Sequence, residues 1–193
     1  RHVITGQTEE EALEFLKTHS ATHLLIVSDE IGKYPAFSSI GSDENYDRYS
    51  WINVFALDSS QTQETRDNIL YLYRGTFVLD DDFIYNDLVF PRQAAGIIGF
   101  VLPFKKNSNN IELAQPTAIM VYNNQRYDIP LNCVFIKDKE TTFSGDGLNG
   151  CLRIIPNADD PQNINPIGAA LYLSEKVRKT LFTKLYLYGE ESA

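Results

Sequence analysis

The middle of the chain is a series of short, β-rich runs separated by polar turns, and this alternation limits the folds available to it. Each run has the length of a strand and is rich in Val, Ile, Phe and Tyr, which favour strands. The runs lie at residues 77–79, 83–85, 96–102, 117–122, 125–129, 133–136 and 151–155. Asn123 and Asn124 separate two of them, and because asparagine tolerates a positive φ this pair predicts a β-hairpin. Residues 76–165 are therefore expected to form a β-rich lobe.

The beginning of the chain has a different pattern. Thr8 and Glu11 form a capping box, which predicts a helix from Glu9 to about His19. Residues 23–27 follow as a fully apolar run, typical of a strand that is covered on both faces. A helix, a short turn and a buried strand indicate an α/β arrangement.

The remaining segments complete the expected fold. We expect a strand at 51–57, a helix at 63–73, polar loops at 43–47 and 157–166, and a helix at 174–182 with Ser174 as its N-cap. The predicted fold class is α+β. Residues 1–75 and 166–193 form a mixed α/β core, into which the β-rich lobe, residues 76–165, is inserted.

Charge and apolar pattern exclude several classes of partner. The chain has 26 acidic and 17 basic residues, a net charge of −9. Nucleic acids and anionic lipid surfaces both require a basic footprint, so we expect neither as a partner. The longest apolar stretch, 88–104, is interrupted by Pro91, Arg92 and Pro103. It does not reach the about 20 apolar residues of a transmembrane helix.

Three other patterns point to chemistry only weakly. Residues 145–150 spell G-x-G-x-x-G, but a strand rather than a helix follows, which favours a glycine-rich turn over a nucleotide site. Residues 80–82 with Asp87 lack the glycine of a calcium loop and are expected to be a solvated turn. Cys133 and Cys151 match no zinc pattern, so they form either one disulfide or two free thiols.

The segment 28–41 carries the most specific pattern. Glu30, Lys33, Phe37 and Ile40 stand at i, i+3, i+7 and i+10, which places them on one stripe of a helix. Pro35 is tolerated in a first turn, so the continuous helix is expected to start near Tyr34, after a turn. The alternative interpretation is an amphipathic helix whose Phe37 and Ile40 enter the core.

This stripe resembles the DK/MI region of archaeal oligosaccharyltransferase catalytic subunits, whose pattern is D-x-x-K-x-x-x-M-x-x-I after an apolar strand. Glu30 stands in place of the Asp and Phe37 in place of the Met, whereas Lys33 and Ile40 match. The helix before the strand and the segment 173–189 are also similar to the family, so the resemblance covers about residues 1–57 and 167–193. The family's W-W-D-Y-G motif is absent, because Trp51 is the only tryptophan. We expect that motif upstream of this chain.

The resemblance implies a function. The full-length protein would transfer an oligosaccharide from a lipid-linked donor to the Asn of Asn-X-Ser/Thr. This chain would be its C-terminal domain, on the extracytoplasmic face of the cell membrane, as part of a multi-pass membrane protein. Glu30, Lys33, Phe37 and Ile40 would help to form the pocket for the acceptor's Ser or Thr.

The resemblance also sets expectations for cofactors and activity. Mn²⁺ or Mg²⁺ would bind to other parts of the full-length enzyme, with no cofactor in this chain. The isolated chain is therefore expected to be inactive. The implied location permits a disulfide, and Cys133 and Cys151 are expected to lie close together. The alternative function is a cell-surface binding or adhesion module with no catalytic role.

Overall fold

The computed structural model describes residues 2–6, 8–27, 30–41, 52–107, 110–137, 139–156 and 168–188. The loops expected at 43–47 and 157–166 lie outside these residues. The chain divides into two compact units, residues 1–52 with 173–193 and residues 53–172. We call them the helical unit and the β unit. The predicted domain boundaries, with a core of residues 1–75 and 166–193 and an inserted lobe of residues 76–165, stay a prediction.

The β unit contains almost all of the strands. They are β1 (Asn53–Leu57), β2 (Gln63–Glu64), β3 (Asn68–Val78), β4 (Phe83–Tyr85), β5 (Leu88–Phe90), β6 (Gly96–Asn107), β7 (Asn110–Leu113), β8 (Thr117–Tyr122), β9 (Gln125–Pro130), β10 (Cys133–Ile136), β11 (Lys139–Thr142), β12 (Cys151–Pro156) and β13 (Gly168–Leu173). A short 3₁₀-helix, η1 (Ser59–Gln61), follows β1. The short, β-rich runs expected in the middle of the chain are confirmed as strands.

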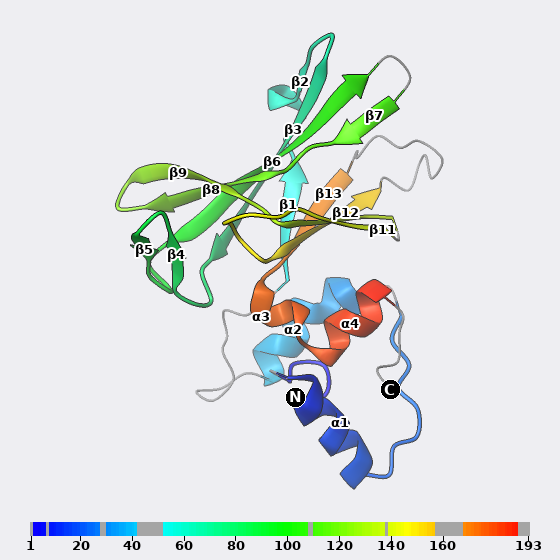
Figure 1. The fold of residues 1–193 in the computed structure, drawn as a ribbon. Coiled ribbons are helices and arrows are strands. Elements are labelled where there is room, and N and C mark those ends of the chain that lie inside the picture. The colour runs from blue at the N-terminus through cyan, green and yellow to red at the C-terminus, as the bar shows by residue number, and fades with distance from the viewer. Residues whose placement is uncertain are drawn as a thin grey trace. The chain divides into compact units, whose positions relative to one another are not determined.

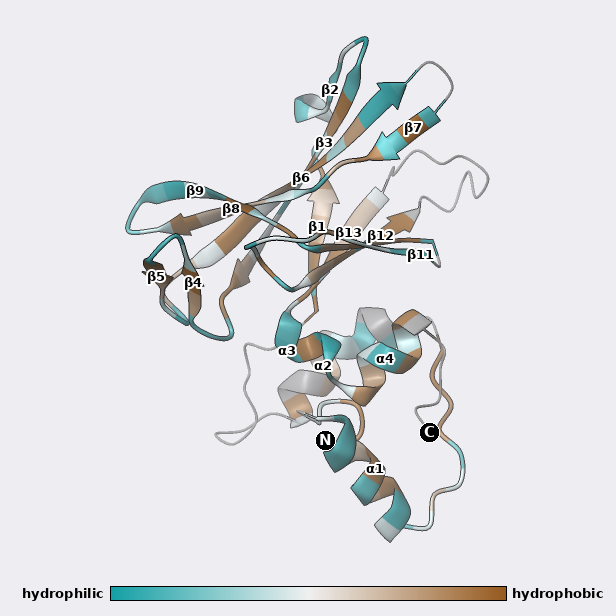
Figure 2. Ribbon diagram, in the orientation of Figure 1, coloured by the Kyte–Doolittle hydropathy of each residue, from teal (hydrophilic) through white to brown (hydrophobic). Residues whose placement is uncertain are grey.

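Eleven of the strands form one curled sheet, in the order β11-β10-β12-β13-β1-β3-β6-β8-β9, with β2 and β7 attached to β3 and β6 (Figure 1). Strands β4 and β5 form a separate hairpin. Among the pairs whose register is described, β10 with β12 is parallel and the others are antiparallel. The middle of β8 is hydrophobic, whereas the tip of the β8–β9 hairpin is hydrophilic (Figure 2).

The helix expected at residues 63–73 is wrong, because this segment forms β2 and the first half of β3. Ile69, Tyr71 and Tyr73 are buried, and the residues between them are only partly covered. This is the two-residue period of a strand with one face in the core. The ring of Tyr71 packs edge-on against Phe104 of the neighbouring strand β6, with ring centroids 5.9 Å apart.

The hairpin expected at Asn123–Asn124 is confirmed. The two asparagines have φ of 50° and 59°, and they join β8 to β9. Two consecutive residues with positive φ twist a turn in the same sense as the flanking strands. The register follows from this turn, since Tyr122 pairs with Gln125 and the pairing continues to Thr117 and Pro130.

The helical unit consists of α1 (Glu9–Thr18), α2 (Glu30–Gly41), α3 (Glu175–Arg178) and α4 (Leu181–Tyr188) (Figure 1). The predicted first helix is confirmed, with Thr8 Oγ1 accepting a hydrogen bond of 3.2 Å from Glu11 N–H. The single helix expected at 174–182 is instead two helices, α3 and α4. Ser174 caps α3, as expected, by accepting from Val177 N–H at 3.3 Å.

Helices from the two ends of the chain are joined by an ion pair. The Lys184 ammonium of α4 binds Glu9 Oε2 of α1, 175 residues earlier in the chain. The Glu9 side chain is only 10% exposed and that of Lys184 is 40% exposed. A carboxylate this well covered is stabilised only if its partner stays in place.

The buried strand expected at residues 23–27 is wrong. These residues form no strand, and Leu25 is 83% exposed. An apolar run is buried as a strand only when neighbouring strands pair with it, and no described strand does so here.

The predicted fold class is therefore wrong as well. The unit formed by the chain ends is helical rather than a mixed α/β core, and the described chain as a whole is mostly β. The wrong predictions at residues 63–73 and 23–27 have one cause. The apolar pattern of a short segment fits either a helix or a strand, and only pairing with other strands decides between them.

Candidate functional site

Helix α2 carries the four residues of the predicted acceptor pocket. It is helical from Glu30, so the prediction of a turn before Tyr34 is wrong. The Glu30 carboxylate bonds back to the chain, since its Oε2 accepts a hydrogen bond of 3.0 Å from Val27 N–H. Glu30 N–H in turn donates to the Val27 carbonyl at 3.0 Å. Glu30 thus closes the first turn, where a negative charge also suits the helix dipole.

Tyr34 anchors α2 to α4. Its side chain is 3% exposed, and its ring centroid lies 5.1 Å from that of Phe182. Burial raises the pKa of the Tyr34 hydroxyl to about 12, because the phenolate would lose its hydration. The hydroxyl therefore stays protonated at neutral pH. Tyr34 acts as packing and not as a general base.

The four predicted residues lie to one side of this anchor. At about 100° per residue, Glu30 and Phe37 stand nearest to the buried direction of Tyr34, and Lys33 and Ile40 stand further around the helix. Their exposure follows the same order: Glu30 and Phe37 are half-buried, whereas Lys33 is exposed and Ile40 is 86% exposed. The interpretation in which Ile40 enters the core is therefore wrong.

The resulting surface combines an aromatic ring, an aliphatic side chain and an ammonium group. It offers apolar contact from Phe37 and Ile40, and Lys33 can donate hydrogen bonds. None of the four is a nucleophile paired with a base, so this stripe is suited to binding rather than to bond-making. The apolar strand that precedes the motif in the family is not present at residues 23–27.

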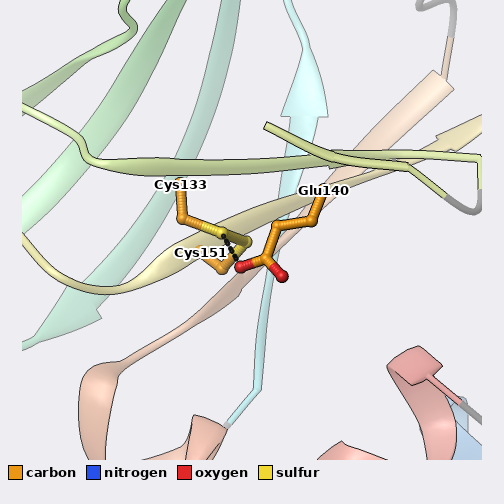
Figure 3. Close-up of a disulfide and its surroundings, with 3 residues drawn as sticks. All are labelled: Cys133, Glu140 and Cys151. Atoms are coloured by element: carbon orange, nitrogen blue, oxygen red, sulfur yellow. Dashed lines mark hydrogen bonds between the residues drawn. A yellow bond between two sulfur atoms is a disulfide. The ribbon is translucent and has the colours of Figure 1, made fainter. Parts of the chain in front are cut away.

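The second cluster of reactive side chains lies in the β unit. Cys133 of β10 and Cys151 of β12 form a disulfide, so the expectation that they lie close together is confirmed (Figure 3). The Glu140 carboxylate of β11 lies beside it, with Oε1 3.3 Å from Cys133 Sγ (Figure 3). Sequence reasoning missed Glu140. The β10–β11 pairing, with Cys133 opposite Thr142, places Glu140 on the same side of its strand as Thr142.

These three residues are the group in the described part of the chain whose atoms lie close enough together to hold a metal ion. A cysteine binds a metal ion through its thiolate. In the disulfide each sulfur is bonded to the other, so this oxidised form offers one carboxylate and no thiolate. The cluster in this state is a covalent link between neighbouring strands.

The other motifs have structural roles. The G-x-G-x-x-G segment, residues 145–150, leads into strand β12 and not into a helix, which agrees with a glycine-rich turn. Asp82 Oδ1 accepts a hydrogen bond of 2.7 Å from Arg92 N–H, and Asp82 N–H donates to Asp81 Oδ1 at 2.9 Å. These carboxylates thus stabilise a turn. Asp81 and Asp82 are exposed, as expected for a solvated turn, but Asp80 is buried, at 7% exposed, so that part of the expectation is wrong.

No described helix is long and apolar enough to cross a bilayer. Comparisons of the chain with family models, curated proteins and solved structures find no match. The features of this chain that point to a function are the geometry of α2 and the resemblance of its residues to the DK/MI pattern.

Proposed function

We propose that this chain is an acceptor-recognition domain of an oligosaccharyltransferase, the enzyme that couples glycans to the Asn of Asn-X-Ser/Thr. The observation that carries the proposal is the exposure of Ile40. An isoleucine on a well-anchored helix would normally turn toward the core, yet here Tyr34 takes that position and Ile40 faces outward. Ile40 is also the position that corresponds to the isoleucine of the DK/MI pattern.

The proposed role of each residue follows from its chemistry. Ile40 packs on the γ-methyl of an acceptor threonine, and Phe37 extends this apolar contact. Lys33 donates hydrogen bonds to the acceptor backbone or hydroxyl. Glu30 has a positioning role, because its carboxylate holds the first turn of α2 on the Val27 backbone.

The rest of the reaction requires groups that this chain does not supply. The lipid-linked oligosaccharide and Mn²⁺ or Mg²⁺ bind elsewhere in the full-length enzyme, which acts on the extracytoplasmic face of the membrane. The described part of this chain has no nucleophile–base pair on the α2 surface. The isolated chain is therefore expected to transfer no glycan to an Asn-X-Thr peptide.

The test compares threonine and serine acceptors in the full-length enzyme. One buried methyl group contributes about 0.8 kcal/mol, which is roughly a fourfold preference for threonine. We expect Ile40→Ala to reduce the threonine-to-serine ratio of kcat/KM toward unity. Because Ile40 is 86% exposed, the substitution should leave the melting temperature nearly unchanged.

Ile111→Ala is the matched control. Ile111 lies in β7 and is 55% exposed, so this variant removes a similar amount of apolar surface outside α2. The control should keep the wild-type ratio. An Ile40→Ala enzyme that folds, transfers glycan and keeps the wild-type ratio would remove Ile40 from the proposed pocket, and with it the observation on which the proposal depends.

A further inference from the structure

A cavity of about 480 Å³ lies in the β unit, and neither cysteine of the disulfide is among its lining residues. One wall is the end of strand β4 with the turn that follows it. The other wall is the glycine-rich turn, residues 145–150, which precedes β12. The residues that matter for its chemistry are Phe83, Tyr85, Asn86, Gly145, Asp146 and Asn149. They are brought together from segments about 60 residues apart in the chain.

The glycine-rich wall is held rigidly by one asparagine. Asn132 Nδ2 donates to the Gly145 carbonyl at 3.1 Å and to Asn149 Oδ1 at 3.2 Å. Asn132 Oδ1 in turn accepts from Gln115 Nε2 at 3.1 Å. Gly145 has φ of 120°, a conformation that other residues rarely adopt. Asp146, between these fixed points, is exposed at the cavity.

The other wall is aromatic. The rings of Phe83 and Tyr85 stand nearly parallel, with an interplanar angle of 11° and centroids 6.3 Å apart. The Phe83 ring packs against Phe90, which is 1% exposed, with the two ring centroids 6.0 Å apart. Asn86, at φ of 49°, ends this wall with a carboxamide. Both rings are half-buried because they pack against the hydrophobic core of the β unit, and both also line the cavity.

The combination of walls restricts the ligand. Among the described residues, the lining has no lysine, arginine or histidine, which disfavours anions. The same residues supply a single carboxylate, whereas Ca²⁺ takes six to eight oxygen ligands, usually with several carboxylates. A sugar ring has an apolar C–H face for an aromatic wall and hydroxyl groups for carboxylate and amide partners. We infer that this cavity is a binding site for a neutral saccharide. The inference is independent of the function proposed for α2.

The test is a titration of the ¹⁵N-labelled chain with D-glucose, D-mannose, D-galactose and N-acetyl-D-glucosamine, followed by amide chemical shifts. We expect at least one sugar to cause saturable shifts confined to residues 83–86 and 145–149. Intermolecular nuclear Overhauser effects should be observed between the C–H protons of the sugar and the ring protons of Phe83 or Tyr85. Because a charge-assisted hydrogen bond is about twice as strong as a neutral one, Asp146→Asn should weaken binding about tenfold.

Asp128→Asn is the matched control, since Asp128 is an exposed acid on β9 that binds Arg126 at 2.9 Å and does not line the cavity. It should bind the sugar as the wild type does. The inference is overturned if none of the four sugars gives saturable shifts, or if Asp146→Asn binds as tightly as the control. Shifts at residues 145–149 with CaCl₂ but with no sugar would identify a cation site and would also overturn it.

Discussion

Opening the disulfide should destabilise the β unit by an amount that can be estimated from its position. Cys133 and Cys151 are separated by 18 positions in sequence, and they link the parallel neighbours β10 and β12. For a closed loop of this length, the chain-entropy model gives about 3 kcal/mol of stabilisation. In a unit the size of the β unit this corresponds to a fall in melting temperature of roughly 10 °C.

The assay is thermal unfolding of the chain with and without a dithiol reductant, followed by circular dichroism at a wavelength dominated by strands. Alkylation and mass spectrometry on the same samples measure how much of the disulfide is open. The Cys133→Ala/Cys151→Ala double variant is the control, since its melting temperature should already be low and should not respond to reductant. Both cysteines are buried, so the double variant also loses some packing and should melt slightly below the reduced wild type.

One result would refute this reasoning. If alkylation shows that the disulfide is fully open and the melting temperature is unchanged, the loop between β10 and β12 is already constrained in the unfolded chain. Closing the disulfide would then remove little conformational entropy from the unfolded chain. A fall in melting temperature in the double variant as well, on adding reductant, would show that the reductant acts elsewhere.

Three further predictions concern packing and charge. Lys184→Met should lower the free energy of unfolding by about 2 kcal/mol, a value that is discounted because the lysine is partly exposed. Adding Glu9→Gln should recover part of this loss, as measured by urea titration. Equal urea midpoints for the wild type and both variants would contradict the ion pair. Gly147→Ala should cost about 1–3 kcal/mol in the same assay, because the new Cβ would stand 2.5 Å from the Pro130 carbonyl oxygen. The raised pKa of Tyr34, about 12, stabilises the folded state fully below pH 10, and this contribution is lost as the pH rises from 10 toward 12. The free energy of unfolding of Tyr34→Phe should therefore fall less steeply with pH than that of the wild type over this range. Identical pH profiles for the two proteins would argue against a buried hydroxyl.

The parts of the fold that the sequence predicts correctly are those that depend on neighbouring residues. The turn at Asn123 and Asn124 needs only the tolerance of asparagine for positive φ. The cap at Thr8 likewise needs only residues within one helical turn. The prediction of a helix at residues 63–73 is wrong because Ile69 and Tyr73 satisfy both a helical and a strand period, and only pairing with β6 decides between them.

The candidate sites show the same limit. The spacing of Glu30, Lys33, Phe37 and Ile40 is enough to place them on one flank of a helix. Which flank is covered depends on Phe182, which packs on Tyr34 from the other end of the chain. The cavity between β4 and residues 145–150 could not be predicted, because the G-x-G-x-x-G pattern of residues 145–150 indicates a turn and only the fold brings β4 beside it.

The ion pair between α1 and α4 also has a consequence for the order of events during synthesis. Glu9 and Lys184 are 175 residues apart, and at 5–20 residues per second this separation takes roughly 10 to 35 s to translate. Strands β3, β6, β8 and β9 are neighbours that can pair as they emerge, whereas α1 must wait for α4. During this interval the nascent chain exposes the side of α1 around Ala12, which is fully covered in the finished protein. A nascent-chain chaperone that binds short apolar helices would find its target there, until α4 leaves the ribosome.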